Sequence, residues 1–196
     1  MVGGDGILVG ADGVARCAWA GSSPDYLRYH DAEWGVPVHG ETALLERLIL
    51  ESFQSGLAWI TILRKRENFR AAFAGFDADA IAAFGEADVA RLMADAGIVR
   101  NRRKIEAAIA NARATVALRD EGGLDAFVWS FVPATHTPPA TLADLPTTSP
   151  EAKALAKALK DKGFRHLGPT TVYAGMSACG LVDDHLTGCF RSGAGR

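Results

Sequence analysis

The sequence is poor in cysteine: its 196 residues include three, at positions 17, 179 and 189. Such a small, odd number argues against a disulfide framework and for a reducing compartment. The chain also lacks an apolar run near the ~18 residues that cross a bilayer, so we expect no membrane association. Its start, MVGGDGILVGADGVAR, lacks the basic head and continuous apolar stretch of a signal peptide. These absences favour a cytoplasmic protein.

An excess of positive charge is also missing. Lys and Arg number 21 against 23 Asp and Glu, which gives a net charge of −2. A simple nucleic-acid-binding domain is usually basic. The positive residues are nevertheless bunched at 63–70, 100–104 and 160–165. Each run alone is most simply a solvated helix face, whereas three runs that converge would bind a polyanion, and the sequence leaves this open.

Long β-type alternation and internal repeats are absent, and most of the chain has helical periodicity. We therefore expect an all-α fold, with one domain over 16–190, a flexible N-terminal extension over 1–15 and a flexible tail over 191–196. The segment 124–132 fits either a short helix or a strand, and the Pro- and Thr-rich stretch 133–150 predicts a loop. Helices are predicted at 41–56, 78–85, 86–97, 101–123, 149–163 and 168–180.

Four possible metal ligands form two pairs. His185 and Cys189 are four residues apart and would share one face of a helix. Cys17 and His30 supply a second pair, and Cys₂His₂ is a closed tetrahedral set suited to zinc. A zinc ion there would be structural, with no position for water, and would tie the N-terminal segment to the C-terminus. Spacing alone gives a zinc site about the same weight as two unrelated Cys and His pairs. Cys179 is expected in the core.

A carboxylate is predicted on an apolar helix face. Glu51 follows Leu48 by three residues and Leu44 by seven, so it projects from the buried side of its helix. A carboxylate in that position is paired, capped or functional, because burying an uncompensated charge is costly. Aromatic residues near it in sequence are either ordinary core or, with the carboxylate, a pocket for a flat cationic ligand. These aromatic residues are Trp19, Tyr29, Trp34 and Trp59.

A glycine-bracketed turn joins the last two predicted helices. Gly163 and Gly168 flank it, and Pro169 then opens a helix that carries Thr170 and Thr171 in its first turn. Glycine permits the unusual backbone of such a turn, and helix N-termini bind phosphate. The pattern is typical of a helix-hairpin-helix that grips the DNA backbone, although many corners between helices have similar sequences.

Seven segments taken together resemble one family. RCAW, YHDAEWG, ESFQSGLAWITILRKRENFR, DAGIVRNRRKI, FVWSFV, GFRHLGPTT and ACGLVDDHLTGC occur in the order found in the DNA-3-methyladenine glycosylase I family, from Arg16 to Cys189. The resemblance implies the all-α helix-hairpin-helix DNA glycosylase fold, with two helical lobes around a base pocket. It implies a bacterial, cytoplasmic, monomeric and monofunctional enzyme of base excision repair. Such an enzyme flips 3-methyladenine out of alkylated double-stranded DNA and hydrolyses its N-glycosidic bond.

The resemblance also assigns residues. It makes Glu51 the catalytic carboxylate that hydrogen-bonds the damaged base, and Trp59 the ring that stacks on it. The resemblance also places Trp19, Tyr29 and Trp34 in the pocket, and it implies a structural zinc site formed by Cys17, His30, His185 and Cys189. Gly56 and Leu57 fall in a loop that probes the duplex. Contacts to the DNA backbone are implied for Gly163, Gly168, Thr170 and Thr171.

One position departs from the expected pattern. Many members of the glycosylase superfamily have an essential aspartate in the context V-D-x-H, and Asp183 lies in that register. We favour a supporting role for Asp183, because carboxylates commonly orient metal-bound histidines. The place that holds a lysine in lyase-type relatives is near Thr170, so no Schiff-base nucleophile is evident.

Other functions compete with this assignment. A non-enzymatic, zinc-stabilised helix-hairpin-helix module would explain the turn and the metal, but not a carboxylate among aromatic residues. A zinc hydrolase is disfavoured, because four protein ligands leave no position for water. A glycosylase that also accepts 7-methylguanine is a near variant that the sequence leaves open.

Overall fold

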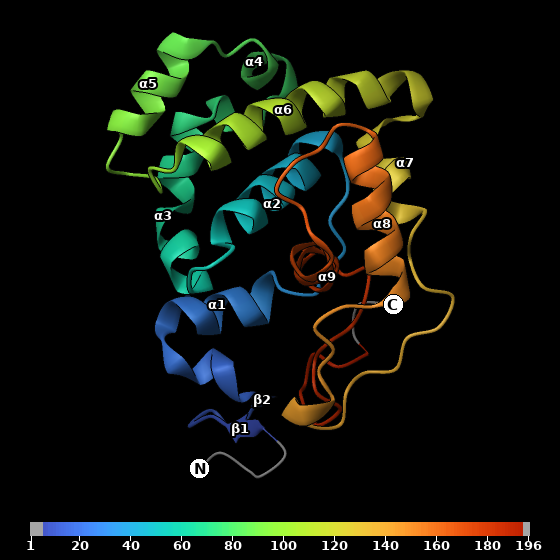
Figure 1. The fold of residues 1–196 in the computed structure, drawn as a ribbon. Coiled ribbons are helices and arrows are strands. Elements are labelled where there is room, and N and C mark those ends of the chain that lie inside the picture. The colour runs from blue at the N-terminus through green and yellow to red at the C-terminus, as the bar shows by residue number, and fades with distance from the viewer. Residues whose placement is uncertain (1–5, 194–196) are drawn as a thin grey trace.

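The computed structural model describes residues 6–193 and confirms the all-α class (Figure 1). In this part of the chain no helix is long and apolar enough to cross a membrane. Short 3-10 helices lie at Ala18–Ser22, Ala74–Phe76, Arg119–Glu121 and Leu142–Asp144. The α-helices are α1 Pro24–Ala32, α2 Glu41–Gln54, α3 Trp59–Ala72, α4 Ala78–Ala82, α5 Glu86–Ala94, α6 Arg102–Leu118, α7 Gly123–Trp129, α8 Pro150–Asp161 and α9 Pro169–Ala178.

Helix α2 forms the centre of the molecule. Its side chains Leu45, Ile49, Leu50 and Phe53 are fully buried. Helices α6 and α9 both pack against α2, and Figure 1 shows α6 crossing above it and α9 lying below. Because α2 is covered by several helices, a polar side chain that it carries toward α9 is shielded from water.

The predicted helices are found, but several end earlier than expected. Helix α2 ends at Gln54, and Gly56 follows in a left-handed conformation with φ of 81°. Helix α6 ends at Leu118, before Gly122 and Gly123, which both have positive φ. The ambiguous segment 124–132 is largely helical, as α7.

The N-terminal segment forms a small β-sheet, whereas we expected a flexible extension and no sheet. Strands β1 (Ile7–Val9) and β2 (Ala15–Cys17) form an antiparallel hairpin. The C-terminal segment joins it, because the Phe190 amide donates to the Ala15 carbonyl. Strands of three residues are too short to show alternation in the sequence. Of the expected extension and tail, residues 1–5 and 194–196 lie outside the described part.

The turn between α8 and α9 is held by a buried side chain of α6. The amide group of Asn111 accepts a hydrogen bond from the Arg165 nitrogen at 2.7 Å and donates to the Arg165 carbonyl at 3.2 Å. Gly163 has φ of 95°, and His166 has φ of 57°, a left-handed conformation that costs energy for a residue with a Cβ. The hairpin is therefore fixed to the core helix instead of being a loose connection.

A buried lysine caps the C-terminal end of α2. The Nζ of Lys104 donates to the carbonyls of Phe53 at 2.8 Å and Ser55 at 2.6 Å, and burial lowers its pKa. We expect Lys104→Met to lower the free energy of unfolding by about 1–3 kcal/mol, because it leaves buried carbonyls without donors. Urea denaturation measures this. Lys65→Met is the matched control: Lys65 also donates to two carbonyls, those of Ala96 and Gly97, at a partly exposed position. Equal losses in the two variants would contradict the expectation.

Candidate functional site

A cavity of about 440 Å³ lies between α1, α2, α3 and α9. All five predicted pocket residues line it, although they come from positions as far apart as 19 and 59. The structure thus brings together around one cavity the residues that the sequence analysis selected. The full lining is Trp19, Tyr26, Tyr29, Trp34, Glu51, Gln54, Trp59, Leu145, Pro146, Thr147, Thr170, Tyr173, Ala174, Ser177, Ala178 and Asp184.

The aromatic side chains pack against one another around the cavity. The Tyr29 and Trp59 rings are tilted with centroids 5.5 Å apart, and those of Trp19 and Trp34 meet edge to face at 5.2 Å. Such pairs are favourable geometries for aromatic rings. Tyr26 accepts a hydrogen bond on its hydroxyl from the Ile60 amide at 3.0 Å, which fixes the start of α3 and with it Trp59. These contacts hold the rings in place before any ligand binds.

Glu51 lies in the last turn of α2 with 5% of its surface exposed. Burial raises the pKa of its carboxyl group from its usual 4.5 to about 7, against the opposing positive charge of Arg47. In the described part of the chain, no residue donates a hydrogen bond to its carboxyl group. Gly175 of α9 lies beside it, since a Cβ at this glycine would be 3.8 Å from the Glu51 Cγ. A buried carboxyl group kept without a protein donor is suited to receive one from a ligand.

Arg47 supplies a positive charge that acts on Glu51. Its Nη2 donates to Glu33 at 3.2 Å, and Arg66 also pairs with Glu33. Its Nη1 is buried with no hydrogen-bond partner among the described residues. Arg47 influences Glu51, Tyr29 and Cys179 electrostatically, and its own pKa is raised. It therefore stabilises the ionised form of Glu51 but does not neutralise it in a direct pair.

The raised pKa of Glu51 predicts a pH-dependent stability. A carboxyl group whose pKa is higher in the folded protein than in the unfolded chain makes its full contribution to stability below the pKa of the unfolded chain. That contribution is lost as the pH rises through the pKa of the folded protein. For Glu51 this window runs from about pH 4.5 to about 7. We expect Glu51→Gln to be more stable than the wild type at pH 8, by about 3 kcal/mol. The difference should shrink toward zero near pH 4.5, as measured by urea denaturation at each pH. A constant difference across the series would contradict the assignment.

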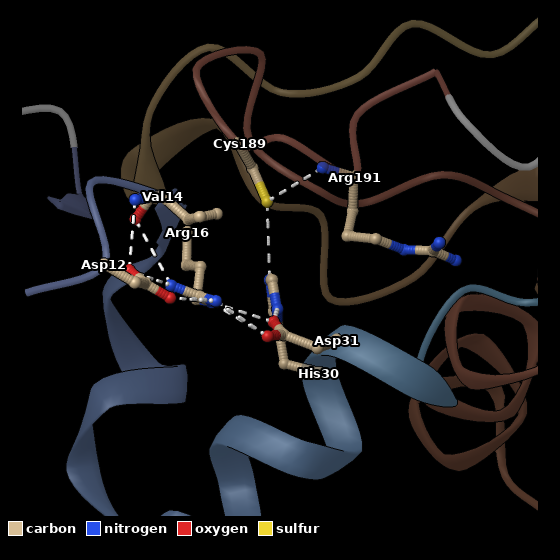
Figure 2. Close-up of polar contacts among 7 residues, drawn as sticks. All are labelled: Asp12, Val14, Arg16, His30, Asp31, Cys189 and Arg191. Carbon is tan, nitrogen blue, oxygen red and sulfur yellow. Dashed lines mark hydrogen bonds and ion pairs between the residues drawn. The ribbon is translucent and has the colours of Figure 1, made fainter. Parts of the chain in front are cut away.

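Three of the four predicted metal ligands form a buried cluster. The ligand atoms of Cys17, His30 and Cys189 all lie within 4.8 Å of one another. The Cys189 sulfur is 3.4 Å from the His30 Nε2 (Figure 2). Hydrogen bonds from Cys17 and His30 lower the pKa of the Cys189 thiol. The site can thus supply a thiolate, the form of cysteine that binds metals.

The fourth predicted ligand lies next to this cluster. The His185 ring centroid is 5.2 Å from that of His30, and its Nε2 is buried with no hydrogen-bond partner in the described part. Gly35 makes room for it: a Cβ there would be 2.5 Å from the His185 Cε1. A buried orphan nitrogen next to two cysteines and a histidine is the chemistry that a tetrahedral zinc site requires. The residues present therefore fit the ion.

Carboxylates orient both histidines. The Nδ1 of His30 contacts Asp31 at 2.8 Å, and the Nδ1 of His185 contacts Asp183 at 2.9 Å. Each contact leaves the Nε2 atom for the centre of the cluster. Asp183 thus occupies the supporting position that we favoured, and it does not line the aromatic cavity.

The N-terminal hairpin extends this support. Arg16 lies between Asp31 and Asp12, with hydrogen bonds of 2.8 to 3.0 Å to the two carboxylates, as Figure 2 shows. Asp12 is part of the segment expected to be flexible, and here it fixes Arg16, which in turn fixes Asp31. The hairpin is consequently an outer layer of the cluster.

The segment that carries His185 and Cys189 is not helical, although we paired the two residues by assuming that they share one face of a helix. Residues after α9 form turns, and the Asp183 carboxylate accepts a hydrogen bond from the His185 backbone amide at 3.1 Å. A Cys189–Leu186 backbone hydrogen bond closes another turn. The two side chains meet through this loop geometry and not through helical spacing.

The residues predicted to contact DNA lie at turns and helix starts. Leu57 is 39% exposed beside Gly56, and Gly168 precedes the first turn of α9, which carries Thr170 and Thr171. A groove of about 820 Å³ runs along Gly163 and the rest of the α8–α9 turn. Basic side chains line this groove, namely Lys153, Lys157, Lys160, Arg165 and His166.

The other basic runs are largely engaged within the protein. Arg64, Arg66 and Arg70 of the run 63–70 pair with carboxylates of Asp25, Glu33 and Glu46 respectively. In the run 100–104, Arg102 pairs with Glu86, and Lys104 caps α2 as described above. The three runs therefore do not contribute equally to a basic surface.

Comparisons with known proteins find relatives that are similar to this chain in both sequence and structure. The family described as methyladenine glycosylase matches residues 19–192. DNA-3-methyladenine glycosylase 1 of Escherichia coli K12 is 49% identical over 90% of this chain and 96% of its own length. A crystal structure of 3-methyladenine DNA glycosylase I is 51% identical, with a TM-score of 0.86 over 89% of this chain and 98% of that chain. A variant in complex with 3-methyladenine is 36% identical, with a TM-score of 0.85 over 90% and 97% of the two chains.

Proposed function

Because this chain belongs to the methyladenine glycosylase family, we propose that it is a monofunctional DNA glycosylase of base excision repair. It releases 3-methyladenine from alkylated double-stranded DNA, as a monomer in the bacterial cytoplasm. The observation that carries this proposal is the buried carboxyl group of Glu51 in a cavity walled by aromatic rings. Neither a DNA-binding module nor a zinc hydrolase requires that combination.

The substrate base carries a positive charge, which explains the composition of the pocket. The Trp59 and Tyr29 rings offer π faces to a flat cation, an interaction of about 0.5–2 kcal/mol. Glu51 accepts a hydrogen bond from the base, and its negative charge favours the methylated cation over neutral adenine. Extrusion from the duplex costs a few kcal/mol, and least for a base that already pairs poorly.

Hydrolysis then needs little protein chemistry. As the N-glycosidic bond breaks, its electron pair moves to the base, which leaves neutral, and positive charge develops on the deoxyribose. Water forms the new bond to C1′ and releases a proton, so the product is an abasic site. The pocket contributes by holding the base, excluding bulk water and stabilising charge. In this mechanism no lysine nucleophile is required.

We propose that Cys17, His30, His185 and Cys189 hold one structural zinc ion. The supporting observations are the close approach of three ligand atoms, the orphan Nε2 of His185 and the oriented histidine rings. When bound, the ion would cross-link the N-terminal and C-terminal segments. Those segments carry Trp19, Trp34 and Asp184 of the cavity wall, so the ion would stabilise the pocket indirectly.

We also propose that the α8–α9 hairpin binds the DNA backbone as a helix-hairpin-helix. Gly163, Gly168, Thr170 and Thr171 would contact phosphates through exposed amides and hydroxyls. The lysines along the adjoining groove would add charge that is independent of sequence. Gly56 and Leu57 would enter the gap that the extruded base leaves.

The proposed activity is tested with methylated duplex DNA. We expect selective release of 3-methyladenine, measured by chromatography of the freed bases, and no strand cleavage. Release of 7-methylguanine at a comparable rate would show a broader specificity. Folded protein that binds duplex DNA but releases no base would support the DNA-binding module instead.

A further inference from the structure

A largely buried arginine shares one face of α2 with Glu51. Arg47 precedes Glu51 by four residues, one turn of the helix, and both lie within α2. Side chains on a helix lean toward its N-terminus, so Glu51 extends over the turn that carries Arg47. The Arg47 side chain is only 12% exposed. A cation at this depth needs compensating negative charge, because burying an isolated one is costly.

Glu33, which follows α1, supplies part of that compensation. It accepts hydrogen bonds from the Nη2 of Arg47 at 3.2 Å and from the Nη2 of Arg66, on α3, at 2.9 Å. Burial acts to raise the pKa of Glu33, but the two arginines outweigh it, and the pKa lies below its usual value. Glu33 is therefore one negative charge between two positive charges. The three groups carry a net charge of +1, which an ionised Glu51 balances.

The bond to Glu33 leaves part of the Arg47 guanidinium group free. Its Nη1 is buried with no hydrogen-bond partner among the described residues, and no hydrogen bond there joins Arg47 to Glu51. Burial raises the pKa of Glu51 to about 7, and the charge of Arg47 acts against that rise. Arg47 thus acts on Glu51 through space and leaves both carboxylate oxygens available to a ligand.

Tyr29 and Cys179 are also influenced electrostatically by Arg47. Burial raises the pKa of the Tyr29 hydroxyl, and it raises that of the Cys179 thiol to about 12. Both groups therefore stay neutral in solutions near neutral pH. Of the three groups, Glu51 is the one that changes its charge in this range.

Charged groups on other helices that pack against α2 have partners of their own. The Nζ of Lys104, on α6, donates to the Phe53 and Ser55 carbonyls. At the opposite end of α2, Asp125 of α7 accepts from the Gly40 amide, and Asp79 of α4 pairs with Arg119. The other titratable groups of the cavity wall are Tyr26, Tyr173 and Asp184.

We propose that Arg47 sets the acidic limit of the activity, as a positioning residue that keeps Glu51 ionised without binding it. This inference rests on the proposed function. A protonated Glu51 has no charge with which to favour the cationic base, so base release fails below that limit. Arg47 moves the limit toward lower pH and extends the activity to neutral solution. Because Glu33 anchors the guanidinium group, the carboxylate stays free for the base.

The pH dependence of base release tests this inference. The alkylated nucleoside carries a fixed charge, so the rising limb of the profile reports the enzyme. Rates are measured with enzyme in excess but below saturation, where the profile reflects ionisations of the free protein. We expect a wild-type midpoint near pH 7. Arg47→Met should raise the midpoint by about 1 unit or more, the usual effect of losing a neighbouring opposite charge.

In terms of rate, that shift corresponds to a fall of about 5-fold at pH 7 and of less than about twofold at pH 9. Loss of packing alone would instead lower the rate at every pH and leave the midpoint unmoved. Arg47→Lys keeps the charge, so its midpoint should stay within about 0.5 units of the wild type.

Arg66→Met is the matched control. Arg66 is the other arginine bound to Glu33, but its charge does not contribute to the shift of the Glu51 pKa. We expect this variant to lose stability in urea and to keep the wild-type midpoint. Groups elsewhere, such as His166 in the hairpin groove, are the same in all variants and cannot produce a difference between them.

A folded Arg47→Met protein with the wild-type midpoint would overturn the inference, and so would an equal shift in Arg66→Met. If Arg47→Met does not fold, Arg47→Gln also removes the charge, and the same outcomes decide. A wild-type protein that releases no base would refute the proposed function. An active wild type whose midpoint is independent of Arg47 would refute this inference alone.

Discussion

Replacing Glu51 by Gln is expected to lower the single-turnover rate of 3-methyladenine release by about 100- to 1000-fold. The substitution keeps the size of the side chain but removes its charge. Glu51 is 5% exposed and its carboxyl group receives no hydrogen bond from the described residues, so the pocket offers this group to the ligand alone. Because the interaction takes place away from bulk water, it is stronger than an exposed ion pair would be. Release of the labelled base from methylated duplex DNA, measured with excess enzyme, gives the rate directly.

The same variant should also bind the free base more weakly, by about 10-fold, as the loss of one hydrogen bond to a charged group implies. Glu46→Gln is the matched control, because Glu46 is another buried carboxylate of α2, paired with Arg70 on a face that does not line the cavity. We expect this control to lose stability and to keep its rate of base release. Equal rates in Glu51→Gln and the wild type would remove Glu51 from the reaction.

The sequence predicted α2, α4, α5, α6, α8 and α9, and five residues that line the cavity, but it did not predict α1 or α3. Apolar periodicity identified α2, and the position of Glu51 on its buried face indicated an unusual carboxylate. Trp19, Tyr29, Trp34 and Trp59 were recognised as a set from the resemblance and from their proximity to Glu51 in sequence. Such residues are predictable because they lie within one continuous stretch around α1, α2 and the start of α3.

Residues brought to the pocket from distant parts of the chain escaped that reasoning. Tyr173 and Asp184 come from α9 and the loop after it, and residues 145–147 from a segment that the sequence indicated only as loop. Nothing local in the sequence marks these positions. The one available signal was the second acidic residue in VDDH, where we considered Asp183 and not Asp184.

The predicted metal ligands come together through a local geometry that the sequence did not predict. A spacing of four residues suggested a helix for His185 and Cys189, but the Asp183 side chain bonds the His185 amide and favours a turn. The left-handed Gly180 ends α9 just before, and a Cβ there would lie 2.8 Å from the Gly35 carbonyl oxygen. Close packing of this loop against residues 35–37, invisible in the sequence, determines where His185 points.

Removal of the proposed zinc ion is expected to cause a large loss of stability. Purified protein should contain one zinc per chain, and incubation with a strong chelator should lower the melting temperature by at least about 10 °C. For a domain of this size that shift corresponds to about 3–5 kcal/mol. The physical reason is that Cys17 and Cys189 lie 172 positions apart, so the ion closes a loop that includes almost the whole chain. Cys189→Ser should lose both the metal and a similar amount of stability.

Cys179→Ala separates the metal from simple packing. Cys179 is as buried as Cys189, but it lies outside the ligand cluster, and burial raises the pKa of its thiol to about 12. We expect this control to keep one zinc per chain and to lose only about 1 kcal/mol, the usual effect of a small truncation in the core. Restoring zinc to the chelated wild type should restore its melting temperature, whereas Cys189→Ser should not respond. Metal-free protein with an unchanged melting temperature would show that the four residues are held together by packing and hydrogen bonds alone.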